Sequence, residues 1–138
     1  MSHENVEVVL ASIEAFNAGD VDAQMATYLP TAVAITHTSQ EARLPDVDVR
    51  MEGRAAIGRW VTETLQAWRF RYEPSEVRAV SDNTVLCRGG RMGGVGATTG
   101  IEAYIDTSVL FRLRDSLIER VEFFDQPDEA LKAAGLEA

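Results

Sequence analysis

Apolar residues in the first thirty positions recur at the spacing of amphipathic helices. The first set steps by three and four residues and predicts a helix that Gly19 closes in a left-handed position. The second set predicts a shorter helix, capped by Asp20 and stopped by Pro30. The members of the two sets are Val6, Val9, Leu10, Ile13 and Phe16, and then Val21, Met25, Tyr28 and Leu29.

A third helix follows Gly53, and the period of the pattern then changes. The helical stripe consists of Ile57, Trp60, Val61, Thr64, Leu65 and Trp68. From Arg69 onward apolar and polar residues alternate, which is typical of strands and predicts them at 70–80, 84–93, 99–114 and 117–124. Residues 31–38 are predicted to form a first short strand, and the polar residues 39–51 a loop.

Turns and glycines indicate how these strands are arranged. The turn sequences at 81–83 and 114–116 are tight, so the strands that they join should be antiparallel. Glycines crowd the second long strand, where they mark bulges, bends or close approach: Gly89, Gly90, Gly93, Gly94 and Gly96. Pro127 and Gly135 suit the two ends of a final short helix. We therefore expect an α+β fold in which N-terminal helices pack against a strongly curved, mostly antiparallel sheet. Such a sheet usually encloses a small-molecule pocket.

Composition narrows the class of partner. A chain of 138 residues predicts one domain over 1–138, and its net charge of −9 argues against nucleic acid and anionic membranes. No apolar run approaches the ~20 residues of a membrane span. The first residues lack the features of a signal peptide, and the single cysteine, Cys87, cannot form an internal disulfide. These observations favour a cytoplasmic protein.

Four segments of the chain, in this order, resemble the SnoaL-like proteins of the NTF2-like superfamily. They are ENVE at 4–7 with IEAFNAGDVDA at 13–23, EGRAAI at 52–57, FRLRD at 111–115 and DEALKAAGL at 128–136. The resemblance implies a cone-shaped α+β fold and a homodimer formed through the sheet. The superfamily contains polyketide cyclases, ketosteroid isomerases, epoxide hydrolases, dehydratases and non-catalytic binders, so the resemblance implies a pocket and not one reaction.

Two residues are candidates for acid/base catalysis, His37 and Asp106. His37 ends the first predicted strand, near the pocket mouth of the fold that the chain resembles, and an imidazole can exchange protons at neutral pH. The alternative is a solvent-exposed histidine. Asp106 shares a strand face with Tyr104, and a carboxyl group in an apolar pocket can move protons. The alternative is an exposed or interface residue.

Six further residues are candidates for ligand binding. The aromatic Phe16, Tyr28 and Trp60 lie on helical stripes and could line the cavity or simply fill the core. Arg88 could clamp a substrate oxygen, although a pair with Asp106 across the sheet is the simpler interpretation. Tyr104 accompanies Asp106, and Asp125 could either serve the site or cap the last helix.

The sequence therefore supports two hypotheses of different kinds. The first is a cofactor-free acid/base enzyme of isomerase, cyclase, dehydratase or hydrolase type, acting on a small apolar carbonyl or cyclic compound. The second is a non-catalytic ligand-binding or dimerisation module. We expect no metal and no cofactor, because paired-histidine, Walker and nucleophile-elbow motifs are absent from the sequence. The glycine-rich run at 89–100 lies within strands, which does not suit a dinucleotide site.

Overall fold

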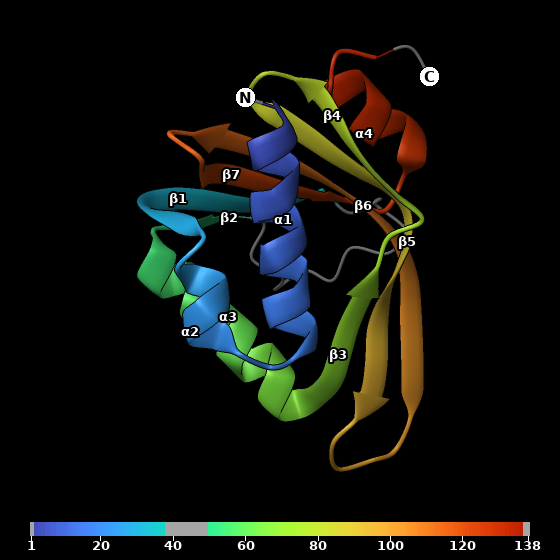
Figure 1. Ribbon diagram of the computed structural model, residues 1–138. Coiled ribbons are helices and arrows are strands. Elements are labelled where there is room, and N and C mark those ends of the chain that lie inside the picture. The colour runs from blue at the N-terminus through green and yellow to red at the C-terminus, as the bar shows by residue number, and fades with distance from the viewer. Residues whose placement is uncertain (1, 38–49, 137–138) are drawn as a thin grey trace.

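The computed structural model describes residues 2–37 and 50–136, which form a bent sheet with helices against it (Figure 1). The helices are α1 (Ser2–Asn17), α2 (Val21–Met25), α3 (Arg54–Ala67) and α4 (Pro127–Ala133). The strands are β1 (Tyr28–His37), β2 (Arg50–Glu52), β3 (Trp68–Glu73), β4 (Glu76–Ser81), β5 (Thr84–Gly96), β6 (Glu102–Arg114) and β7 (Leu117–Phe124). The α+β class and the N-terminal helices agree with the sequence prediction.

The strands form one open sheet in the order β2-β1-β7-β6-β5-β3, with β4 beside β3 along β5. Only the pairing of β1 with β7 is parallel; all the other pairs between described strands are antiparallel, as the tight turns predict. In Figure 1 the hairpin of β5 and β6 extends beyond the rest of the sheet, away from α4. The sheet curves around α1, α2 and α3, so its inner face encloses the core.

The second helix is shorter than its hydrophobic pattern predicts. It ends at Met25, and Tyr28 belongs to β1 because its backbone pairs with Ile118 of β7. The register between β1 and β7 shifts between Tyr28 and Val33, a stretch that contains Pro30. Proline has no N–H for a ladder, so it is tolerated at such an irregularity. The cap is confirmed: Asp20 Oδ1 accepts a hydrogen bond of 3.1 Å from the Ala23 N–H.

The single strand predicted at 70–80 is two strands. Pro74 and Ser75 interrupt it, and both halves still pair with β5, β3 with 91–96 and β4 with 84–88. The third helix stops at Ala67, so Trp68 begins β3 instead of ending the helical stripe. Of the loop predicted at 39–51, residues 50 and 51 belong to β2, and the others lie outside the described residues.

Glycine sets the bend of β5. Gly89 has a φ of +62°, a left-handed conformation that other residues adopt with strain, and it lies where the β5–β6 register shifts. A Cβ at Gly94 would overlap the carbonyl oxygen of Arg69 on β3. The backbones of β3 and β5 therefore approach closely only because this position has no side chain.

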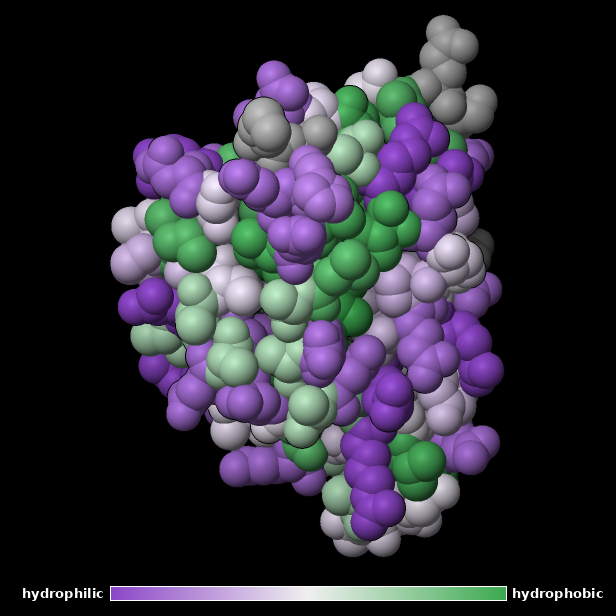
Figure 2. Space-filling model, in the orientation of Figure 1, coloured by the Kyte–Doolittle hydropathy of each residue, from purple (hydrophilic) through white to green (hydrophobic). Residues whose placement is uncertain are grey.

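The apolar residues form two clusters on opposite faces of the sheet. The inner cluster joins α1 and α3 to the sheet, and it includes Cys87, which is fully buried as expected of a core thiol. The outer cluster, Leu86, Leu110, Phe124 and Ala130, packs α4 against β5, β6 and β7. Figure 2 shows a mostly hydrophilic face with a strip of hydrophobic side chains beside α1. None of the described helices is long and apolar enough to cross a membrane.

Candidate functional site

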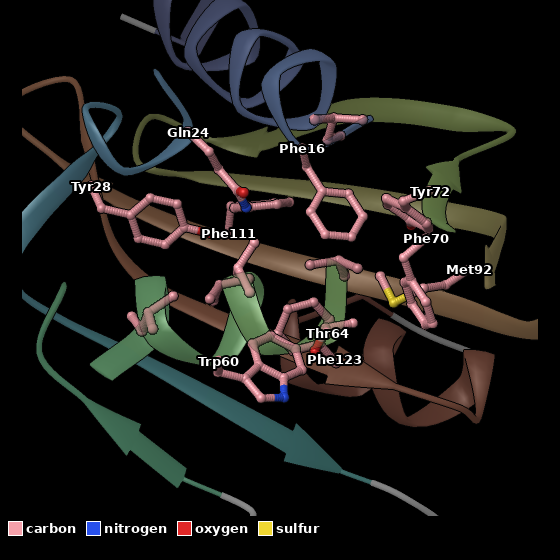
Figure 3. A pocket seen from close by; sticks show the side chains of 15 residues that line it. Phe16, Gln24, Tyr28, Trp60, Thr64, Phe70, Tyr72, Met92, Phe111 and Phe123 are labelled. Carbon is pink, nitrogen blue, oxygen red and sulfur yellow. The ribbon is translucent and has the colours of Figure 1, made fainter. Parts of the chain in front are cut away.

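A central cavity lies between the helices and the inner face of the sheet (Figure 3). The volume that the centre of a water molecule can occupy in this cavity is about 50 Å³. A single water needs roughly 10–15 Å³ by this measure, so the cavity has room for several waters or one compact ligand. Its fifteen described lining residues are Ile13, Phe16, Gln24, Tyr28, Ile57, Trp60, Val61, Thr64, Phe70, Tyr72, Met92, Val109, Phe111, Val121 and Phe123. None of the fifteen is charged.

Aromatic side chains hold the walls of this cavity. Phe16 of α1 meets Phe70 of β3 edge to face, with ring centroids 6.3 Å apart. Trp60 of α3 meets Phe123 of β7 in the same way at 5.7 Å. Such contacts tie helices to strands across the cavity and keep an apolar surface on both sides.

One corner of the cavity is polar. The Tyr28 hydroxyl is hydrogen-bonded by the side chains of Ser12 and Gln24, all three of which are at least nine-tenths buried. Burial raises the pKa of Tyr28 to about 12, and these two hydrogen bonds offset only part of that rise. The phenol therefore stays protonated at neutral pH and can act as a hydrogen-bond donor, not as a base.

A second buried phenol is committed to the backbone. Tyr72 donates a hydrogen bond of 3.1 Å to the carbonyl of Thr107, and burial raises its pKa well above the ordinary range. This bond joins β3 to β6 across the cavity wall. Burial also raises the pKa of the Cys87 thiol to about 12, so this cysteine is a core residue without thiolate character.

The imidazole of His37 lies on the outer face of the sheet, not in the central cavity. It stacks on Phe124, with centroids 4.6 Å apart, and its Nε2 lies 3.1 Å from Oε1 of Glu122. Glu122 is buried, and Arg120 and Arg112 also approach its carboxylate, at 3.2 Å and 4.0 Å. Arg112 in turn donates to the carbonyl of Ala133 at the end of α4. A buried carboxylate thus has three cationic or polar neighbours, as burial of a charge requires.

A groove, here called the outer groove, lies between this region and the cavity and shares lining residues with the cavity. It is lined by Thr36, His37, Trp60, Met92, Ile105, Thr107, Phe123, Phe124 and Asp125. Trp60, Met92 and Phe123 belong to both the groove and the cavity. Asp125 therefore lies in the same groove as His37. It does not cap α4, whose N-cap is Gln126.

The other candidates lie apart from both hollows. Asp106 is exposed and stands opposite Arg91, so it does not converge with His37 on one site. The expected pair of Arg88 with Asp106 is wrong, because the bulge at Gly89 shifts the register. Arg88 stands opposite Glu76, with Nη1 and Oε1 4.0 Å apart.

Tyr104 points away from the cavity as well. Its ring is half-exposed on the outer side of the β5–β6 hairpin, 4.2 Å from the guanidinium carbon of Arg91. Of the aromatic candidates, Phe16, Tyr28 and Trp60 do line the central cavity, where the sequence hypothesis placed them.

The comparisons with known proteins identify the family. The SnoaL-like domain family matches residues 9–121, which is most of the chain. The chain belongs to the SnoaL-like family. None of the curated proteins is similar enough in sequence to count as a match.

Solved structures with the same fold have low sequence identity to this SnoaL-like chain. A putative polyketide cyclase from Xanthomonas campestris pv. campestris is 24% identical, with a TM-score of 0.74 over 96% of this chain and 97% of that one. A putative isomerase from Bacillus subtilis is 17% identical, with a TM-score of 0.75 over 98% and 95%. A Mycobacterium tuberculosis protein in complex with estradiol-17beta-hemisuccinate is 15% identical, with a TM-score of 0.74 over 87% and 92%.

Sequence reasoning missed two polar residues of this SnoaL-like structure, Gln24 and Glu122. Gln24 lies on the second helical segment beside Met25, and a polar residue at that place reads as solvent-facing. Glu122 alternates with Val121 and Phe123 on β7, so the sequence pattern is enough to place it on the outer face. Its burial could not be predicted, because it depends on α4 and on Arg112. Among the described residues, no three His, Cys, Asp or Glu side chains are grouped closely enough to hold a metal ion.

The raised pKa of Tyr28 predicts a loss of stability in alkali. Its pKa is 10.0 in the unfolded chain and about 12 in the folded protein, so between these pH values the unfolded state releases the proton first. Each pH unit in that window should lower the free energy of unfolding by up to about 1.4 kcal/mol. Urea unfolding at increasing pH should show this slope, and Tyr28→Phe should make it shallower. An unchanged slope in the variant would contradict this origin.

Proposed function

We propose that this protein binds a small, largely apolar molecule in its central cavity. The observation that supports this best is the cavity itself, with eleven apolar side chains and four neutral polar ones on its described walls. Apolar walls with a few placed polar groups are the usual form of a small-molecule site. The steroid derivative in the Mycobacterium tuberculosis structure is a largely apolar ring compound in a protein of the same fold, which agrees with this proposal.

The test compares the NMR signals of the two tryptophans of the chain, one inside the cavity and one outside it. Trp60 lines the cavity and Trp68 does not, so titration with cyclohexanone should shift only the Trp60 indole N–H signal in NMR spectra. Thr64→Phe puts a phenyl ring into the cavity and should weaken binding at least about tenfold, since a filled cavity excludes the ligand. Thr62→Phe, on the exposed side of the same helix, is the matched control. Equal binding by the two variants would place the ligand elsewhere.

Acid/base catalysis is the second candidate, and the outer groove is what favours it. His37 has a side chain 39% exposed in this groove, next to Glu122, and a ligand extending past Trp60 would reach the imidazole. Asp125 lines the same groove. An acid/base reaction of isomerase type at this place needs no cofactor, because the imidazole itself takes and returns the proton.

A proton-exchange measurement tests this second candidate. If His37 acts as a base, the protein should accelerate the exchange of the α-protons of cyclohexanone in heavy water, as NMR would record. His37→Ala should then lose more than about tenfold of the acceleration. The chain has one other histidine, His3, exposed on α1, so His3→Ala is the control and should keep full activity. A protein that accelerates nothing, or an active His37→Ala, would leave ligand binding alone.

We further propose a homodimer that forms through the outer face of β3, β5 and β6. This face carries Arg69, Arg71 and Arg91 together with Glu73, Glu102 and Asp106. A two-fold interface places each patch against its own copy, so equal numbers of both charges suit self-association. Light scattering after size exclusion should give twice the monomer mass of 15.1 kDa, and a mass near 15.1 kDa would rule the dimer out.

A further inference from the structure

The polar corner of the central cavity contains an acceptor without a partner. The side-chain oxygen of Gln24, Oε1, is buried and makes no hydrogen bond with any described residue. The residue is 7% exposed, and its carboxamide reaches in among the aromatic side chains of the cavity (Figure 3). Most buried polar atoms have a partner, so this exception leaves room for a water or a bound molecule to supply one.

The neighbouring residues determine which side-chain atom of Gln24 has no hydrogen-bond partner in the described part of the chain. The Gln24 carboxamide is hydrogen-bonded to the Tyr28 hydroxyl, and its oxygen Oε1 makes no hydrogen bond with a described residue, so the amide nitrogen is the atom in this bond. The backbone carbonyl of Gln24 is already occupied by the Thr27 hydroxyl at 2.6 Å. The amide nitrogen thus meets Tyr28, and the side-chain oxygen is the atom left for a further partner.

The unpaired oxygen determines what a ligand must offer there. A buried carbonyl without a donor loses the hydrogen bonds that it makes in water, and this costs about as much as a hydrogen bond is worth. Water can donate to it in the empty cavity. A ligand that displaces such a water loses affinity unless it also donates. A ketone or a hydrocarbon cannot donate, whereas an alcohol or a phenol can.

We propose that the ligand of the central cavity is a small ring compound that carries a hydroxyl group, donated to Gln24 Oε1. This inference rests on the proposed binding function and narrows it, since the sequence had suggested a carbonyl compound. The hydroxyl is bound at the corner formed by α1, α2 and β1, and the ring lies against Phe16 and Trp60. Gln24 is then the residue that determines specificity.

Three probes of nearly equal size separate the polar contact from the apolar one: cyclohexanol, cyclohexanone and methylcyclohexane. Their dissociation constants are measured from the Trp60 indole N–H signal. The wild-type protein should bind cyclohexanol about tenfold more tightly than the other two, the worth of one hydrogen bond at a buried site. In Gln24→Met, which keeps the length of the side chain but not the acceptor, cyclohexanol should lose about tenfold and the preference should disappear.

A matched variant controls for the substitution itself. Gln66→Met makes the same replacement on the exposed side of α3, outside the cavity, and should keep the preference for cyclohexanol. The preference of the wild-type protein is itself a test, so a failure of Gln24→Met to fold leaves the inference open to refutation.

The outcomes distinguish failure of the inference about Gln24 from failure of the proposed binding function. If no probe shifts the Trp60 signal, the proposed binding function fails, and the inference with it. If all three bind with equal affinity, or if the preference survives in Gln24→Met, the cavity binds ligands but Gln24 does not select them. Loss of the preference in Gln24→Met alone supports the inference.

Discussion

The bend of β5 is the constraint on which the cavity depends. This strand pairs with β6 along one edge and with both β3 and β4 along the other, so its path sets the position of every strand on that side. Gly89 takes up the bend, and Gly94 lets β3 approach. If β5 ran straight, Phe70 and Tyr72 of β3 would not be carried around to face α1 across the cavity. The cavity is therefore a consequence of sheet curvature, and the helices fill the concave side only in part.

The same sheet keeps charge and cavity on separate faces. The inner face presents apolar and neutral polar side chains around the cavity, among them two phenols and one amide. The outer face contains Glu122 with His37, Arg112 and Arg120, and the end of α4 is bound to this group through Arg112. An ion in the apolar cavity would need partners that the cavity walls do not offer. On the outer face, the half-exposed Arg112 and Arg120 supply them.

Hydrophobic periodicity predicted most elements correctly, and it failed where a distant strand competed with a local helix. Tyr28 fits the stripe of α2, yet it pairs with Ile118 of β7, ninety residues along the chain. The backbone bonds to β7 outweigh the weak preference of a five-residue helix. The face of the sheet on which His37 lies could not be predicted for a related reason. Thr36 and His37 are neighbours on β1, and consecutive side chains of a strand point to opposite faces, so which of them faces inward depends on how β1 is aligned with β7.

The sequence by itself determined the family, the mixed fold and the order of most elements, and it made Phe16, Tyr28 and Trp60 candidates for the cavity, because these follow from local spacing and from motifs. It did not determine which polar residues meet. The register of β5 against β4 and β6, with one bulge at Gly89, placed Arg88 opposite Glu76 and Asp106 opposite Arg91. The packing of α1 on α2 and β1 brought Ser12, Gln24 and Tyr28 together. Contacts of this kind join residues on separate elements, and only the tertiary structure sets the distance between them.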